Sequence, residues 1–432
     1  MMHPILIRGG RIIDPSRGTD GVADLYLSDG RVEAIGRNIA VPPEAQIIDG
    51  SGKVVAPGLI DVHVHLREPG QEDLETVATG AMAAAAGGFT SICAMPNTDP
   101  VTDNQAAVGF IVGKAQRAGK ARVYPIGAIT LGQKGEKLAE FGELVGAGAV
   151  AVSDDGKPVV SSHIMRTALE YARTFGIPVA DHCEDPTLAQ GGAMHEGIVS
   201  TRLGLKGIPA AAEEIMVARD IILSELTGGH VHLCHMSTRG SVDLIRRAKE
   251  KGLRVTAEAT PHHFSLTHEA CEGYNTNAKM NPPLREAEDR DAIRQALKDG
   301  TIDVIASDHA PHHYDAKERE FDDAPNGILG LETALGVALT ELVLPGLLTL
   351  PQLVLRMSTQ PARIFGLAGG TLTVGAPADV VVFDPDARWV VDPSTFYSRS
   401  RNTPFGGRAL NGVVECTVVR GRVVFDRSAP RA

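Results

Sequence analysis

Cysteine is scarce in this sequence and is not arranged as a redox or metal motif. Five cysteines occur in 432 residues, and no two of them form a Cys-x-x-Cys pair. An odd number of widely spaced cysteines argues against a disulfide framework and against a thiolate zinc site. We therefore expect five free thiols: Cys93, Cys183, Cys234, Cys271 and Cys416.

An excess of positive charge is also absent. Lys and Arg number 42 against 53 Asp and Glu, which gives a formal net charge of -11. Because a nucleic-acid surface needs many basic side chains to neutralise phosphates, no nucleic-acid partner is expected. An anionic small-molecule ligand must then be bound by basic side chains close to its site.

Long uncharged apolar runs are missing, and no segment reaches membrane-spanning length. The opening MMHPILIRGG lacks the basic stretch, the apolar core and the small-residue cleavage site of a signal peptide. We expect no membrane association and a cytoplasmic protein. With 43% hydrophobic residues, the chain is able to bury a large core and to hold more than one structural unit.

The middle of the chain alternates eight apolar strand-like runs with stretches able to form helices. Runs that are apolar on both faces need cover on both sides, and eight strand-helix units fit a closed (β/α)8 barrel of the α/β class. An open doubly wound sheet is the alternative, but no run is followed by the Gly-x-Gly-x-x-Gly of its dinucleotide-binding version. The runs are LIDVHVHL, FTSICAM, RVYPIGAI, AVAVSDD, IPVADHC, HVHLCHM, RVTAEAT and DVIASDH.

The two ends of the chain share short alternating strands, such as ILIRGGRIID near the start and GVVECTVVRGRVVFD near the end. Because two-stranded hairpins are marginal alone, we expect both ends to combine into one small β-sandwich domain. The predicted organisation is residues 1–56 and 371–432 for the two parts of this domain and residues 57–370 for the barrel.

Ionisable residues gather at the carboxyl ends of the runs, which converge on one face of a barrel. His63 and His65 are two residues apart, so they share a strand face and are able to bend toward one cation. The alternative for an isolated His-x-His is a hydrogen-bonded pair in the barrel interior. Five more ionisable residues at strand ends weaken that alternative, because burying many ionisable groups together costs free energy unless a cation is present. They are Asp154, Asp155, His182, His235 and Asp308.

The chemistry of these ligands indicates the metal. Imidazole and carboxylate groups without a thiolate favour Zn²⁺, with Mn²⁺, Co²⁺ and Fe²⁺ as other candidates. Arg67 lies one step beyond His65 on the same face, and Asn97 follows the second run. A guanidinium beside a carboxamide is a natural receptor for a substrate carboxylate, whereas a structural salt bridge is the alternative for Arg67.

Four further histidines and two cysteines are expected to lie outside the metal site, whereas His262 and His263 end the seventh run and could reach the pocket. Alternation points Cys183, Cys234 and His232 to the opposite face, where they pack in the core. His262 and His263 stay unassigned, and three histidines in helical or loop stretches are expected on the surface: His163, His195 and His268. The two long connections after the seventh and eighth runs are expected to supply pocket contacts.

Nine strings of the sequence occur in an order found in one known family. Together they closely resemble the bacterial type I dihydroorotases of the amidohydrolase superfamily, and the match spans almost the whole chain. The strings are PGLIDVHVHLREPG, AMPNTDP, SDDG, DHCED, HLCHMST, KMNPPLR, SDHAPH, GILGLET and QPARIFGL.

The resemblance implies a zinc-dependent cyclic amide hydrolase of pyrimidine biosynthesis that interconverts N-carbamoyl-L-aspartate and (S)-dihydroorotate. Because the departing ring nitrogen needs a proton, an acid-base group must lie beside the attacking hydroxide, and Asp308 is expected to fill that role. The resemblance places one or two zinc ions on His63, His65, Asp155, His182, His235 and Asp308. Its substrate contacts fall on His65, Arg67, Asn97, Asn281 and His312 and on the backbone of Asn326 and Gly327.

Two positions depart from relatives. Superfamily members that open hydantoin or allantoin usually carry a carboxylated lysine on the fourth strand, whereas this run ends VAVSDDGK. Lys157 lies beyond the strand in a loop, so Asp155 takes the bridging position and Asp154 points away. A carboxylate on a shorter stem bridges less reliably, which leaves one and two zinc ions open. Relatives often carry an aromatic residue where Asn326 stands; a backbone contact survives that change.

Two other functions compete with dihydroorotase. A hydantoinase or allantoinase is disfavoured by the missing lysine and by Arg67 with Asn97. A noncatalytic partner of aspartate transcarbamoylase is expected to lack metal ligands, and every ligand position is filled here. We expect a homodimer, and association with aspartate transcarbamoylase is left open.

Overall fold

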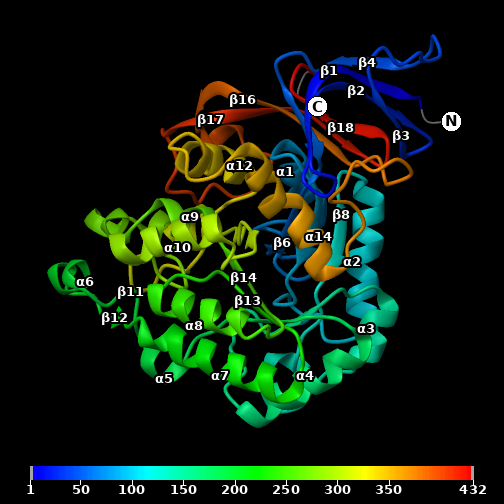
Figure 1. Ribbon diagram of the computed structural model, residues 1–432. Helices are drawn as coiled ribbons and strands as arrows, with labels where there is room; N and C mark the ends of the chain where they lie inside the picture. Colours follow the sequence, from blue (N-terminus) through cyan, green and yellow to red (C-terminus); the bar gives the residue numbers. More distant parts are fainter. Residues whose placement is uncertain (1–2, 430–432) are drawn as a thin grey trace.

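Eight short parallel strands form a closed barrel in the computed structural model, which describes residues 3–429 (Figure 1). Two hydrogen-bonded groups, β6-β7-β8 and β15-β14-β13-β10-β9, are joined by bridges from Gly127 to Val152 and from Val64 to His309. Each strand lies within one predicted run, which confirms the barrel. The strands are β6 (Leu59–Val64), β7 (Phe89–Ala94), β8 (Arg122–Pro125), β9 (Val152–Ser153), β10 (Val179–Asp181), β13 (Val231–Leu233), β14 (Val255–Ala259) and β15 (Val304–Ile305).

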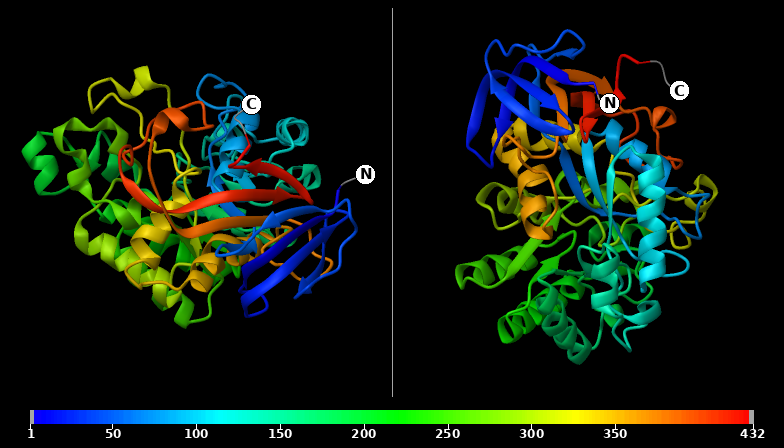
Figure 2. Two further views of the ribbon diagram at one scale, coloured as in Figure 1. Left: turned by 90° about the horizontal axis from the view of Figure 1, so that it is seen from above. Right: turned by 90° about the vertical axis from the view of Figure 1, so that its right-hand side faces the viewer.

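Helices surround the barrel on its outer side (Figures 1 and 2). Their ends follow local sequence: Asn104 caps α2 by accepting from two backbone N–H groups, and Gly119 ends it in a left-handed conformation. The longer helices are α1 (Val77–Ala86), α2 (Gln105–Ala118), α3 (Phe141–Ala147), α4 (Ser162–Phe175), α7 (Ala211–Thr227), α8 (Arg239–Glu250) and α10 (Ala287–Asp299). After β15 come α12 (Ala334–Ala338), η4 (Leu339–Val343), α13 (Leu350–Val354), η5 (Leu355–Thr359) and α14 (Gln360–Phe365).

Short elements lie in the connections between strands and helices. They are η1 (Leu131–Gln133), α5 (Pro186–Ala189), β11 (Met194–His195), α6 (Ile198–Leu203), β12 (Gly207–Ile208), α9 (Pro261–Ser265), η2 (His268–Tyr274), η3 (Thr276–Ala278), α11 (Tyr314–Lys317) and η6 (Pro393–Thr395). Within residues 3–429, no helix combines the length and apolar character needed to cross a membrane. All five cysteines are free and buried, as predicted.

The two ends of the chain build one eight-stranded sheet, and Figure 2 shows blue N-terminal strands next to the orange and red C-terminal strands. Within this sheet β5 pairs with β16. The predicted combination of the two ends is therefore confirmed. The sheet follows the order β18-β17-β16-β5-β1-β2-β3, with β4 on β1. Its strands are β1 (Ile5–Asp14), β2 (Thr19–Ser28), β3 (Arg31–Gly36), β4 (Gln46–Asp49), β5 (Val54–Pro57), β16 (Val380–Val390), β17 (Ala409–Val419) and β18 (Arg422–Asp426).

The sheet and the barrel share one buried core. Val381 and Phe383 of β16 belong to the same apolar cluster as Leu59 and Phe89 of the barrel. The segment after η6 also returns to the barrel, where Asn402 accepts a hydrogen bond from the backbone of His312 at 3.0 Å. The division at residues 56/57 and 370/371 stays a prediction, because packing does not separate the two units there.

Candidate metal and substrate site

The six predicted metal ligands meet at the carboxyl ends of the barrel strands. His63 lies in β6, and the other five follow the ends of β6, β9, β10, β13 and β15. Each of the six residues is at most 5% exposed: His63, His65, Asp155, His182, His235 and Asp308. The parallel barrel brings them together because the same end of every strand opens on one face.

Asp155 lies at the centre of the cluster. Its Oδ1 is 3.4 Å from Nε2 of His63, 3.4 Å from Nε2 of His235 and 3.7 Å from Nδ1 of His182. Its Oδ2 faces Nε2 of His65 at 3.5 Å. The two carboxylate oxygens thus face different imidazoles, an arrangement that suits a bridge between two cations.

Asp308 faces two of the same histidines. Its Oδ1 lies 3.0 Å from Nε2 of His65 and 3.5 Å from Nε2 of His63. Burial alone raises the pKa of Asp308, but the charges of His63 and His65 outweigh it and lower the pKa to about 2. The carboxylate is therefore ionised at neutral pH. The backbone of Asp308 has a φ of 47°, a left-handed conformation that is uncommon for aspartate.

The donor set fits a divalent cation. His63 Nε2 and Asp155 Oδ1 are buried without a hydrogen-bond partner, and both point into the cluster. Nδ1 of His182 and Nε2 of His235 lie 2.9 Å apart. Burial lowers the pKa of His63, yet the carboxylates of Asp308 and Asp155 raise it well above its usual value, so the cluster attracts positive charge. Such a buried set needs a cation to satisfy it.

Glu258 on β14 contacts the predicted ligand His63, although the sequence analysis gave it no role. Its Oε1 accepts from Nδ1 of His63 at 2.6 Å and its Oε2 pairs with Nε2 of His232 at 3.0 Å. Burial alone raises its pKa, but His63 and His232 lower it strongly. A glutamate within an apolar strand was the feature of the sequence from which this contact could have been predicted. The contact holds His63 with Nε2 turned to the cluster.

Glu258→Gln is expected to weaken metal affinity by about 10- to 100-fold, because an amide holds the His63 ring less firmly than a carboxylate. Metal affinity is measured by competition with a chromogenic chelator. Glu44→Gln, which removes the same charge from an exposed position, serves as the control. Equal affinity in both variants would contradict the supporting role.

Two predicted substrate contacts, Asn97 and Asn281, also touch metal ligands. Oδ1 of Asn97 accepts from Nδ1 of His65 at 2.8 Å, which leaves Nε2 of that ring facing Asp308. Nδ2 of Asn281 lies 3.4 Å from Nε2 of His182, and its Oδ1 is buried without a partner. Both amides are thus placed at the rim of the cluster and keep one polar atom for another ligand.

Arg67 is buried beside the cluster without an acidic partner. Its Nε donates to the carbonyl of Pro311 at 3.2 Å, and its terminal nitrogen lies 3.3 Å from Nε2 of His312. Among residues 3–429, no carboxylate lies within 4.0 Å of the guanidinium, so the salt-bridge alternative has no support. Burial lowers its pKa to about 10, which leaves it charged at neutral pH.

His312, Asn326 and Gly327 lie together on the loop after β15. Nε2 of His312 lies 2.8 Å from the carbonyl of Asn326. Gly327 has a φ of 155°, and a Cβ there would meet the His312 ring at 2.6 Å. Its N–H donates to Lys279 and its carbonyl accepts from Asn402, so these backbone groups already have partners. The N–H of Gly327 is therefore occupied, whereas its carbonyl keeps a second lone pair for the predicted backbone contact.

Two buried lysines join the long connections after β14 and β15. Nζ of Lys317 donates to the carbonyls of Thr276 at 3.0 Å and Pro325 at 2.7 Å, and Nζ of Lys279 donates to Phe321 at 2.6 Å. The two connections therefore pack as one wall of the site, a link that the sequence did not reveal.

Several smaller predictions have clear outcomes. The carboxylate of Asp154 accepts from the backbone of Ile129 and Thr130, so it points away from the cluster as predicted, and Lys157 is exposed in its loop. Cys183, Cys234 and His232 are buried as predicted, and His163 is exposed.

The surface prediction for His195 and His268 was wrong. Both are buried, with ring centroids 5.4 Å apart, because the connection after β14 folds over β11. The unassigned His262 and His263 are also buried. Nε2 of His263 donates to the carbonyl of Pro282 at 2.9 Å, which indicates a structural role.

Comparison with known proteins gives consistent matches. A family model described as Dihydro-orotase-like matches residues 52–241, and one described as Amidohydrolase family matches residues 231–425. A dihydroorotase of Pelotomaculum thermopropionicum is 56% identical over 98% of both chains. A dihydroorotase of Geobacter metallireducens is 54% identical over 98% of this chain and 100% of its own.

Solved structures resemble the chain over its whole length at lower identity. An L-hydantoinase (dihydropyrimidinase) from Arthrobacter aurescens has a TM-score of 0.90 and 28% identity, covering 100% of this chain and 98% of its own. A dihydropyrimidinase from Brevibacillus agri has a TM-score of 0.84 and 26% identity, covering 98% and 95%. Both support the fold assignment.

Proposed function

Because the chain belongs to the dihydroorotase family of cyclic amide hydrolases, we propose that it interconverts N-carbamoyl-L-aspartate and (S)-dihydroorotate. The observation that carries this choice is Arg67, a buried guanidinium beside the metal cluster with no carboxylate of its own. The carboxylate that distinguishes dihydroorotate from hydantoin and allantoin supplies that missing partner.

The cofactor in this proposal is Zn²⁺, held by the six strand-end ligands. Their imidazole and carboxylate atoms suit zinc, and the two oxygens of Asp155 allow two ions per chain. When bound, zinc lowers the pKa of a water molecule to about 7 and polarises a carbonyl, which permits amide opening at neutral pH.

Residues of this chain then orient the substrate and move the proton. Arg67 binds the carboxylate, and the free amide atoms of Asn97 and Asn281 reach the same rim, which fixes the ring relative to Asp308. Asp308 is ionised, so its carboxylate takes the proton from the attacking water. It returns that proton to the ring nitrogen as the amide bond breaks.

The other two functions are less well supported. The two hydantoinase-type structures compared above are 28% and 26% identical to this chain. The two dihydroorotases are 56% and 54% identical to it. The lysine typical of the hydantoin-opening members is replaced by Asp155. A noncatalytic role does not account for six converging ligands.

We also propose a cellular location and an oligomeric state. We place it in the cytoplasm as a homodimer, on the family resemblance. Ile215, Ile222 and Leu226 on α7 are exposed apolar side chains that a second copy could cover. Aspartate transcarbamoylase is the other candidate partner. Analytical ultracentrifugation of the protein alone and with that enzyme distinguishes a homodimer from such a complex.

The zinc site predicts a loss of metal without a loss of fold. A His63→Ala/His65→Ala double variant is expected to lose its zinc because both Nε2 atoms face the cluster. Metal content is measured by plasma mass spectrometry and the fold by circular dichroism. The control is His163→Ala/His313→Ala, two exposed histidines. Full zinc in a folded His63/His65 variant would exclude this clamp.

The function itself is tested by following product formation. Purified zinc-loaded protein is incubated with N-carbamoyl-L-aspartate at mildly acidic pH, and dihydroorotate is identified by mass spectrometry. The proposal expects dihydroorotate to accumulate with wild type and not with the His63/His65 variant. Absence of product with a fully zinc-loaded wild type would refute it.

A further inference from the structure

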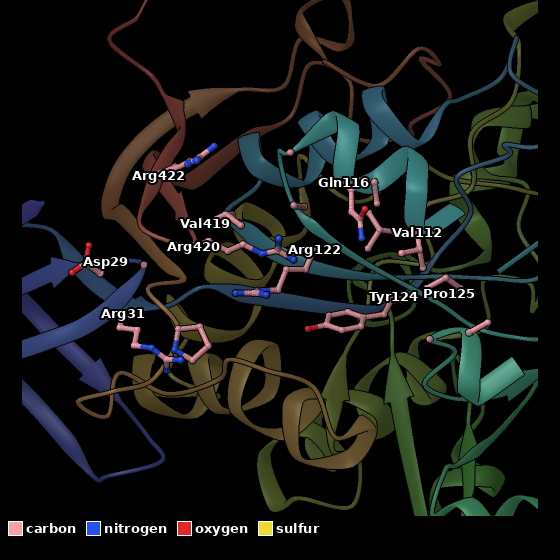
Figure 3. A pocket seen from close by; sticks show the side chains of 18 residues that line it. Asp29, Arg31, Val112, Gln116, Arg122, Tyr124, Pro125, Val419, Arg420 and Arg422 are labelled. Atoms are coloured by element: carbon pink, nitrogen blue, oxygen red, sulfur yellow. The ribbon is translucent and has the colours of Figure 1, made fainter. Parts of the chain in front are cut away.

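A cavity of about 800 Å³ lies between the barrel and the sheet built by the two chain ends (Figure 3). It is lined by α2 and β8 from the barrel, by the turn between β2 and β3, and by the turn between β17 and β18. The cavity runs along the whole of β8, from Arg122 to Pro125, and none of the proposed metal or substrate residues lines it.

Four arginines line this cavity and only one carboxylate does. The arginines are Arg31, Arg122, Arg420 and Arg422, and the carboxylate is Asp29. Within residues 3–429, no carboxylate lies within 4.0 Å of the Arg31, Arg420 or Arg422 guanidinium. Such a concentration of positive charge is unexpected in a chain with a net charge of -11. It marks a place where an anion is favoured.

A buried aspartate holds two of these arginines in place. Asp379 is 2% exposed; its Oδ2 accepts from Nε of Arg122 and its Oδ1 from the backbone N–H of Arg420, both at 2.7 Å. The terminal nitrogens of Arg122 have no hydrogen-bond partner among the described residues. Arg122 extends from its strand toward the turn that carries Arg420 (Figure 3). One guanidinium is thus fixed with its donors open to the cavity.

The rim of the cavity is held by backbone contacts between the two turns. The N–H of Gly421 donates to Ala378, and the N–H of Ala378 donates to Gly30, both at 2.9 Å. Gly421 packs so tightly on Gly30 that a Cβ would meet its backbone at 2.9 Å. Arg31 follows Gly30 and Arg420 precedes Gly421, so these contacts fix the backbone of the two arginines relative to each other. Both side chains are exposed, and Nη1 of Arg31 donates to the carbonyl of Gly375 at 2.7 Å.

We propose that this cavity binds a small molecule that carries two or more linked phosphate groups. Guanidinium forks match phosphate oxygens in pairs, and the three arginines without a carboxylate partner suit more charge than one phosphate carries. The volume falls within the range of about 300–1,000 Å³ typical of small-molecule sites. Val112, Ala115 and Tyr124 form a less polar wall that leaves room for an organic group beside the phosphates.

Isothermal titration calorimetry of the zinc-loaded protein tests this proposal, with pyrophosphate and ADP as probes at about 0.15 M ionic strength. The test variant is Arg420→Gln/Arg422→Gln, whose side chains are exposed and without ion pairs. The control is Arg17→Gln/Arg37→Gln, which removes the same charge from exposed connections next to β1, β2 and β3 but outside the cavity. Zinc content is measured before and after each titration, because both probes chelate metals.

We expect saturable one-site binding to wild type, weakened about tenfold or more in the Arg420/Arg422 variant and within about twofold in the control. Tighter binding of ADP than of pyrophosphate assigns the cavity to a nucleotide, and equal binding assigns it to the phosphate chain alone. The proposal is overturned by absence of saturable binding to wild type, by equal weakening in both variants, or by heat that follows zinc loss.

Discussion

Asp308→Asn is expected to lower kcat for dihydroorotate hydrolysis by about 10² to 10⁴, the usual contribution of a positioned general acid-base group. Asparagine keeps the size of the side chain and one oxygen toward His65, but it cannot accept and return a proton. The ionised state of Asp308, whose pKa is lowered to about 2, is the state that a proton acceptor needs. Zinc content should change little, because five other ligands remain.

Two measurements made on the same preparation separate chemistry from metal loss. Zinc is quantified and kcat is determined at saturating dihydroorotate, with wild type alongside. A low kcat at full zinc supports proton transfer by Asp308. A fully loaded variant that turns over near the wild-type rate would show that the proton travels by another route, and His312, 3.3 Å from Arg67, is then the next residue to test.

Arg67→Met should cost about 2 to 5 kcal/mol in kcat/KM for dihydroorotate, because a desolvated substrate carboxylate loses its charged partner. Methionine retains much of the side-chain volume without the charge. The loss should be much smaller for dihydrouracil, which has the same ring without the carboxylate. This difference between the two substrates isolates the carboxylate contact from any general disturbance of the site.

Arg67→Lys provides the matched control for charge. An ammonium group keeps the attraction but not the planar fork, so its kcat/KM is expected to lie between wild type and Arg67→Met. Equal losses on dihydroorotate and dihydrouracil in Arg67→Met would contradict carboxylate recognition. They would instead assign Arg67 to holding the loop through its contact with Pro311.

The barrel and the convergence of the predicted metal ligands were predictable because their signals are local. Each strand lies in a short run that is apolar on both faces, and each predicted ligand lies near the carboxyl end of such a run. The pair His63 and His65 is visible from spacing alone. The placement of Asp154 away from the cluster also follows from strand alternation, and its hydrogen bonds to Ile129 and Thr130 agree.

Contacts between distant parts of the chain were not predictable in the same way. Glu258 is separated from His63 by 195 positions, and Asn402 reaches His312 from the C-terminal part of the chain. No periodic pattern encodes such pairs. His195 and His268 were misassigned for the same reason, since their burial depends on how a long connection folds over β11 rather than on their own sequence.

The most direct test of the proposed function is the ratio of kcat/KM values for dihydroorotate, hydantoin and allantoin on one zinc-loaded preparation. The buried guanidinium of Arg67 has no carboxylate partner, and of these three substrates only dihydroorotate has a carboxylate to pair with it. We therefore expect dihydroorotate to be preferred by at least about 10²-fold. A higher kcat/KM for hydantoin or allantoin, at full zinc occupancy, would contradict that assignment.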